Sequence, residues 1–410
     1  NRGMVNAAEG VEIQAAGALS NSGGSILAQS GMELATLKGL ENSGLIQSGG
    51  DGTFRISGAL LNNGEILTSG DSVVAASGRL TNTGSLHSGA GSLFDLGGDL
   101  RNAGEILAHG NLGLAVAGRL DNFRLLASDA DASLAVGGIL FNAMGGEILA
   151  FGAADFDVDG DLLNSGRIES NAPGSFEVDG MLVNDAVGRI LSGDGLGFGV
   201  SGSVTNDGIV HSGGSLDLTA ASLDNAGQIL AQGDSDVTLA GGLVNTNLIF
   251  AGGASTFSLA GVLRNIRGNI LSLKDMLLQG LGADSPMAEL LNESGTIETL
   301  EGGMAIRAKV VRNTNLDFTL TPGTEVLSRR GGTYSFYSDN WDQAQDLYEM
   351  LPGSSEVKSK RDALIVMTSE LWLMGLATDR NVFTREEIDA GIAATEARFA
   401  EYGATPEEVA

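Results

Sequence analysis

The sequence predicts an all-β protein, a parallel β-helix with coils of about 20 residues, followed by a small mixed or helical C-terminal module. Residues 78–97 and 98–116 repeat each other, and Asn82 aligns with Asn102, which gives a period of 20. Apolar residues alternate in residues 112–116 (LGLAV), as in a strand with one buried face. Glycines separate such runs, so each unit is expected to contain two strands joined by tight turns.

A unit this short cannot bury its own apolar face, so it must stack on its neighbours. In one coil, Leu60, Ile66, Val74 and Ala76 are therefore predicted to point into a shared interior. With 42% hydrophobic but only 5% aromatic residues, that interior must consist mainly of Leu, Ile, Val and Ala. Strands of successive coils then pair in parallel, about 4.8 Å apart.

An asparagine marks each coil. It follows a Leu or Val by two residues and recurs at Asn21, Asn42, Asn62, Asn82, Asn102, Asn122, Asn142, Asn164, Asn184, Asn206, Asn225, Asn245, Asn265, Asn292 and Asn313. Because the period of these residues is the period of the fold, they are predicted to pass amide hydrogen bonds from coil to coil at a stacked corner. This structural ladder is assigned to Asn62, Asn82, Asn102, Asn122 and Asn142, in preference to glycosylation or ligand sites.

A glycine follows the marker by two residues at Gly64, Gly84, Gly104, Gly166, Gly208 and Gly227. We expect these glycines to provide the positive φ that a tight corner requires.

The net charge of −28 argues against a nucleic-acid partner, because binding phosphates requires a basic surface. The absence of cysteine excludes disulfides and thiolate metal sites. No run of about 18 apolar residues predicts a membrane span. Asn1 begins inside a repeat-like segment without a leader, so we interpret the chain as a fragment whose export signal, if any, lies upstream.

The repeats are predicted to span residues 1–320, with an insertion near residues 270–290. Two-residue extensions after Asn142 and after Asn184 are expected to form turn bulges. Residues 321–410 are predicted to be non-repetitive, with two helices, one of which opens with the capping box of Thr384 and Glu387. They would form a cap or the start of a receptor-binding region.

An aromatic cluster in this module either seals the last coil, which is the preferred interpretation, or binds a partner; it consists of Tyr334, Phe336, Tyr337 and Trp341.

The units LNNGEIL, LRNAGEIL and LDNAGQIL, each followed by a glycine and an alternating strand, resemble filamentous-haemagglutinin repeats. These repeats form the stalk of large bacterial exoproteins secreted by the two-partner route, including adhesins and contact-dependent growth inhibition effectors. The resemblance covers about residues 1–320 and implies a right-handed parallel β-helix that projects a binding or toxic region away from the cell. Residues 321–410 match no toxin motif, although a similar junction precedes the receptor-binding region of such effectors.

The three histidines give no basis for a metal site. His87 and His211 each lie five residues after a marker asparagine but several coils apart, so they cannot meet, and His109 has no partner histidine. Exposed or corner positions are expected for all three. We therefore predict no cofactor.

A cluster of carboxylates alternates with apolar residues in two neighbouring coils and is predicted to face outward together: Asp155, Asp157, Asp159, Asp161, Glu177 and Asp179. The preferred interpretation is a solvated acidic face. A carboxylate pair at glycosidase spacing or a weak Ca²⁺ site is the alternative. Enzymes built on β-helices usually wall their substrate with long loops, whereas these turns are short.

A second apolar residue follows the inward Ile in most coils, at Leu27, Leu67, Leu107, Leu149, Leu191, Leu230, Phe250 and Leu271. If strand alternation continues, these residues form an apolar stripe on the outside. If the chain turns there, they are buried at a corner, and this second interpretation is preferred.

The sequence thus favours a non-enzymatic stalk segment of a secreted, surface-displayed bacterial exoprotein that acts in adhesion or in contact-dependent delivery of an effector. Its expected partners are an outer-membrane two-partner-secretion transporter during export and a receptor on a host or neighbouring bacterial cell. The alternative is a carbohydrate-active β-helix enzyme, a polysaccharide lyase or glycosidase, that uses the surface carboxylates.

Overall fold

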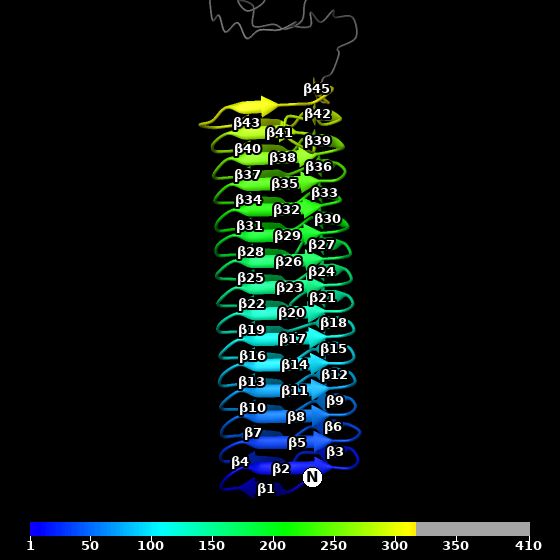
Figure 1. Ribbon diagram of the computed structural model, residues 1–410, viewed down its shortest axis with the longest axis vertical. Helices are drawn as coiled ribbons and strands as arrows, with labels where there is room; N and C mark the ends of the chain where they lie inside the picture. Colours follow the sequence, from blue (N-terminus) through cyan, green and yellow to red (C-terminus); the bar gives the residue numbers. More distant parts are fainter. Residues whose placement is uncertain (317–410) are drawn as a thin grey trace, which may run out of the picture. The chain divides into compact units, whose positions relative to one another are not determined.

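A computed structural model describes residues 1–316, which form one compact unit of 45 strands in three parallel sheets (Figure 1). Sheet A contains β1 (Met4–Ala7), β4 (Ser25–Ala28), β7 (Leu45–Ser48), β10 (Glu65–Thr68), β13 (Ser85–Ser88), β16 (Glu105–Ala108), β19 (Leu125–Ser128), β22 (Glu147–Ala150), β25 (Arg167–Ser170), β28 (Arg189–Ser192), β31 (Ile209–Ser212), β34 (Gln228–Ala231), β37 (Leu248–Ala251), β40 (Asn269–Ser272) and β43 (Thr296–Thr299).

Sheet B contains β2 (Val11–Ala15), β5 (Met32–Thr36), β8 (Gly52–Ile56), β11 (Ser72–Ala76), β14 (Ser92–Leu96), β17 (Leu112–Val116), β20 (Ala132–Val136), β23 (Ala154–Val158), β26 (Gly174–Val178), β29 (Leu196–Val200), β32 (Leu216–Ala220), β35 (Ser235–Leu239), β38 (Ser255–Leu259), β41 (Met276–Gln279) and β44 (Met304–Ile306).

Sheet C contains β3 (Leu19–Asn21), β6 (Leu40–Asn42), β9 (Leu60–Asn62), β12 (Leu80–Asn82), β15 (Leu100–Asn102), β18 (Leu120–Asn122), β21 (Leu140–Asn142), β24 (Leu162–Asn164), β27 (Leu182–Asn184), β30 (Ser203–Asn206), β33 (Ser222–Asn225), β36 (Leu243–Asn245), β39 (Val262–Ile266), β42 (Glu289–Glu293) and β45 (Val311–Thr314).

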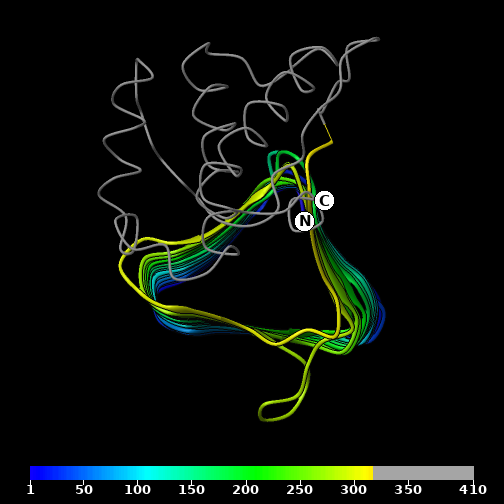
Figure 2. The same cartoon turned by 90° about the horizontal axis from the view of Figure 1, so that it is seen from above.

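Each coil contributes one strand to each sheet, and we number the coils 1 to 15 from β1. Seen along the stacking axis, the coil is a triangle whose sides are the three sheets (Figure 2). The fold is therefore an all-β, right-handed parallel β-solenoid with coils of about 20 residues, as expected. The expectation of two strands per coil was wrong. The third strand is the Leu-x-Asn segment, which is usually three residues long and too short to show alternation.

The core consists of columns of inward side chains in register. Ile66, Leu86 and Ile106 pair in sequence along sheet A, and all three are buried. Leu60, Val74 and Ala76 are buried as predicted. Burying such a side chain contributes roughly 1.5–3 kcal/mol, so the aliphatic columns supply the main stabilisation of the stack.

Aromatic residues enter this core in one place as a stack. The rings of Phe156 and Phe176 lie 4.5 Å apart, and those of Phe176 and Phe198 lie 5.1 Å apart. They occupy the same column as Leu134 of the preceding coil. This column of the core therefore accommodates aromatic side chains in successive coils, where the rings stack on one another.

The coils depart from the 20-residue repeat at turns. Residues 143–146 and 185–188 form bulged turns between sheets C and A, and each is closed by a 2.8 Å backbone bond, Gly146 to Ala143 and Gly188 to Asp185. Residues 280–288, between β41 and β42, form a longer loop that projects from the triangle (the yellow-green excursion in Figure 2). Met287 anchors the base of this loop, since it is fully buried and pairs with Ala308.

Candidate functional site

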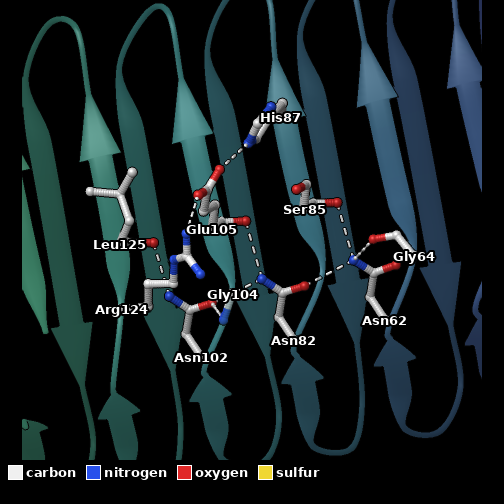
Figure 3. Close-up of polar contacts among 10 residues, drawn as sticks. All are labelled: Asn62, Gly64, Asn82, Ser85, His87, Asn102, Gly104, Glu105, Arg124 and Leu125. Carbon is white, nitrogen blue, oxygen red and sulfur yellow. Dashed lines mark hydrogen bonds and ion pairs between the residues drawn. The ribbon is translucent and has the colours of Figure 1, made fainter. Parts of the chain in front are cut away.

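The marker asparagines form a continuous ladder through the described coils. The Nδ2 of Asn82 donates to the Oδ1 of Asn102 at 2.9 Å, and Asn62, Asn82, Asn102, Asn122 and Asn142 are all fully buried (Figure 3). Fourteen such bonds, each 2.7–2.9 Å long, run with one polarity from Asn21 to Asn313. The asparagine is the last residue of its sheet C strand from β3 to β36, and the last but one in β39, β42 and β45.

The ladder amides from Asn21 to Asn292 also bond the backbone. The Nδ2 of Asn82 donates to the backbone oxygen of Glu105 at 3.1 Å, in the next coil, and the Nδ2 of Asn62 donates to Gly64 within its own coil (Figure 3). An asparagine amide supplies two N–H donors and an oxygen acceptor, whereas an ionised carboxylate only accepts and a hydroxyl has a single donor. The ladder thus ties each coil to the next at a turn where backbone groups lack sheet partners.

The glycines after the ladder are required for a different reason from the one expected. The expected positive φ at Gly64, Gly84 and Gly104 is wrong, because positive φ occurs among glycines of residues 1–316 only at Gly23, Gly145 and Gly282. A Cβ on Gly104 would instead lie 2.0 Å from the backbone oxygen of Gly84 in the preceding coil. Glycine fits in these coils because adjacent coils are packed backbone against backbone there. Arg124 and Asn247 occupy the equivalent position of two other coils, so the close approach belongs to the coils that carry the glycine. The same contact, at 2.1–2.2 Å, excludes a side chain at Gly166, Gly208 and Gly227.

A second buried polar column was missed in the sequence. Ser128 is fully buried, and the one proton of its Oγ is shared between two backbone oxygens, that of Gly110 in the preceding coil at 2.8 Å and that of Asp131 at 2.9 Å. Equivalent hydroxyl bonds occur at Ser48, Ser88, Ser192, Ser212 and Ser272. The available signal was a small residue two positions after the inward Ile or Leu, but Ala108 and Ala150 share the column and weaken it.

Several acidic residues have structural partners at the turns. The Oδ1 of Asp51 accepts from the backbone N–H of Asp71 at 2.9 Å, and the Oδ1 of Asp71 accepts from that of Gly91 at 2.9 Å. Asp131, Asp234 and Asp275 bond the following coil in the same way. Part of the negative charge therefore belongs to inter-coil hydrogen bonding.

The predicted acidic cluster is divided between a face and a turn. Asp155 and Asp157 lie on the outer face of β23, with Glu177 beside Asp157 on β26. The other three carboxylates follow in the turns between sheets B and C, where the Oδ1 of Asp161 accepts from the backbone N–H of Met181 at 2.9 Å.

Asp157 and Asp159 also border a shallow depression of about 320 Å³. Its opposite wall includes Asp95, and Ala115 and Ala135 lie between. No long loop encloses this depression, because the turns beside it are short. Within residues 1–316, no group of three or more His, Asp or Glu side chains is arranged to hold a metal ion.

The histidines lie apart. His87 on β13 and His211 on β31 occupy the same outward column of sheet A, six coils from each other. The Nε2 of His87 is 3.5 Å from Glu105, which also pairs with Arg124 (Figure 3), and the Nδ1 of His109 is 2.5 Å from Asp129. His87 and His109 therefore each pair with a carboxylate, and no two histidines meet, as their spacing in the sequence predicts.

The residue after the inward Ile points outward. Alternation continues through β16, in which Ile106 and Ala108 are buried while Leu107 is half-buried on the outer face. Leu149 has the same environment in β22. The preferred expectation of burial at a corner was therefore wrong: the strand runs on for two residues beyond the inward Ile. Leu27, Leu67, Leu191, Leu230, Phe250 and Leu271 are half-buried on the same face.

The aromatic cluster Tyr334, Phe336, Tyr337 and Trp341, and the two predicted helices, lie outside the described residues. Residues 317–320, the last part of the predicted repeat region, also lie outside the described residues. In residues 1–316 no helix has the length and apolar character needed to cross a bilayer.

These features together define a class: a β-solenoid repeat protein whose recurring residues serve the contact between coils. A model of the haemagglutinin repeat matches residues 1–64, 14–122 and 108–285. The chain therefore belongs to the haemagglutinin repeat family, a structural repeat family. No curated protein and no solved structure matches the chain.

Proposed function

We propose that this chain is a stalk segment of a secreted, surface-displayed bacterial exoprotein that holds a binding or effector region away from the cell. The observation that carries the proposal is the uninterrupted asparagine ladder, whose fourteen bonds join all the coils from Asn21 to Asn313. Membership of the haemagglutinin repeat family supports it, because such repeats belong to two-partner-secretion exoproteins.

The mechanism follows from the linear construction. Each coil contacts only its neighbours, so stability accumulates coil by coil and length can change in whole coils. The acidic surface keeps such a chain soluble. Export would take place through an outer-membrane transporter, with folding of successive coils outside the cell, and a receptor on a host or neighbouring bacterium would be bound by the region at the far end.

Two internal deletions test the proposal in the exporting bacterium. Removing residues 63–122, three whole coils, joins Asn62 to Phe123 and restores the ladder between Asn62 and Asn142. Removing residues 63–112 instead leaves half a coil out of register. The first variant should fold, reach the surface with the transporter present and contact target cells less efficiently; the second should fail to fold. A chain that stays inside cells expressing the transporter, or whole-coil deletion without effect on cell contact, would contradict the stalk.

A carbohydrate-active enzyme remains the second candidate because a depression lies between Asp95 and the pair Asp157 and Asp159. Asp157→Asn and Asp159→Asn test it separately. If the chain degrades a bacterial or host glycan and both variants lose that activity, the enzyme is supported. If no glycan changes while cell contact persists, the stalk is supported.

A further inference from the structure

The outer face of sheet A loses its charged residues over four consecutive strands, β31, β34, β37 and β40, in coils 11–14. These strands pair directly with one another. Of their eight outward residues, five are apolar: Ile209, Leu230, Leu248, Phe250 and Leu271. The other three are His211, Gln228 and Asn269, so no Asp, Glu, Lys or Arg is present. We call these eight residues the sheet A patch.

The other two faces of the same coils do carry charge. Sheet B presents Asp217 and Asp236 outward, and sheet C presents Asp224 and Arg264. Charge returns on sheet A at both ends of the patch, with Arg189 on β28 and Glu298 on β43. An apolar centre without charge inside a charged rim is the composition that distinguishes the core of a protein interface.

We propose that the sheet A patch is a self-association surface at which two copies of this chain pack side by side. A two-fold contact places the same surface on both partners, so the surface must be compatible with itself. On a chain with a net charge of −28, most surfaces would bring carboxylates against carboxylates. The sheet A patch has no carboxylate, and its four strands stack in direct succession (Figure 1).

The size of the patch indicates a weak contact. Four strands spaced about 4.8 Å apart, each about 13 Å long, cover on the order of 250 Å², against about 800 Å² per partner in a standard interface. Leu191, beside Arg189 on β28, adds one apolar residue at the edge of the patch, and Glu169 on β25 ends the apolar column there. We therefore expect a transient dimer that becomes populated where many copies are held close together. This inference does not rest on the proposed function.

Analytical ultracentrifugation of the full chain tests the proposal. The protein concentration should run over about 0.01–0.5 mM, because an interface of such small area is expected to bind weakly. The wild type should shift from monomer toward dimer. More salt should strengthen the association, because it screens repulsion between the acidic chains. The double variant Leu230→Glu with Phe250→Glu should stay monomeric. Its matched control, Thr238→Glu with Ser258→Glu, adds the same charge to outward positions of sheet B in the same coils and should still associate.

A second measurement does not depend on charge. The chain has no cysteine, so Gln228→Cys on the sheet A patch can carry a single bulky maleimide label, with Thr238→Cys on sheet B as the control. The label at Gln228→Cys should block dimer formation, and the label at Thr238→Cys should not. A wild-type chain that remains monomeric at about 0.5 mM in high salt, or dimers that resist both the Glu pair and the label on sheet A, would overturn the proposal.

Discussion

The side-chain amide of Asn82 donates to the side-chain oxygen of Asn102 across 2.9 Å, in a position where both residues have no exposed surface. Each amide in the series accepts from the preceding coil and donates to the following one. A buried hydrogen bond contributes about 1 kcal/mol net, but a buried donor or acceptor left without a partner costs about 1–3 kcal/mol. The ladder is therefore more sensitive to interruption than the energy of one bond suggests.

Asn102→Ala should lower the free energy of unfolding by about 3 kcal/mol, because it removes two ladder bonds and leaves the Nδ2 of Asn82 without its acceptor. Hydrogen exchange should increase most in the coils on either side. Asn102→Asp should destabilise at least as much, since a carboxylate cannot donate to Asn122. Asn63→Ala is the control: Asn63 is exposed beside the ladder and should change stability by less than about 0.5 kcal/mol. Equal effects at Asn63 and Asn102 would contradict a special role for the ladder.

Gly104→Ala should destabilise the chain by about 1–3 kcal/mol, because the added methyl would overlap the backbone oxygen of Gly84 and force two paired coils apart at that point. The matched control is Gly197→Ala, on the outer face of β29, where the nearest atom to the new Cβ is 4.0 Å away. There we expect no loss and a gain of up to about 1 kcal/mol from reduced freedom of the unfolded chain. Urea unfolding of the two variants, followed by circular dichroism, compares them directly.

Ser128→Ala should cost about 1 kcal/mol, clearly less than Asn122→Ala at the end of the preceding coil. The single proton of the hydroxyl is shared between two backbone oxygens, and the Oγ accepts from the backbone N–H of Ala130 at 3.1 Å. Alanine already occupies the equivalent positions at Ala108 and Ala150, so the fold accommodates the loss of these bonds. The ratio of the two destabilisations, measured in one urea series, checks the prediction, and a larger effect for Ser128 would refute it.

Phe176→Ala should lower the free energy of unfolding by about 3–5 kcal/mol, since it opens a cavity between Phe156 and Phe198. Phe176→Leu should cost less than about 1.5 kcal/mol, because leucine occupies this column at Leu114 and Leu134. Thermal unfolding of both variants distinguishes a cavity effect from a specific requirement for ring stacking. If Leu were as harmful as Ala, the stacked rings themselves would be the stabilising element.

The periodic features were predictable because each depends on a residue type that recurs at a fixed interval. The marker asparagine never changes from Asn21 to Asn313, so its column could be drawn from the sequence before any coordinates. The serine column was not predicted, because Ser128 alternates with Ala108 and Ala150 and its bonds go to backbone atoms that carry no sequence signal. The turn carboxylates such as Asp51 were missed for the same reason.

The amino-acid sequence by itself determined the repeat, its register, the aliphatic interior and the asparagine column, because these follow from spacing along the chain. Only the tertiary structure decided what a side chain at Gly104 would meet and on which side Leu107 lies. The first depends on an atom of Gly84, twenty residues away in the chain and in contact across the coils. The second depends on where the strand ends, and inter-coil hydrogen bonds determine that point.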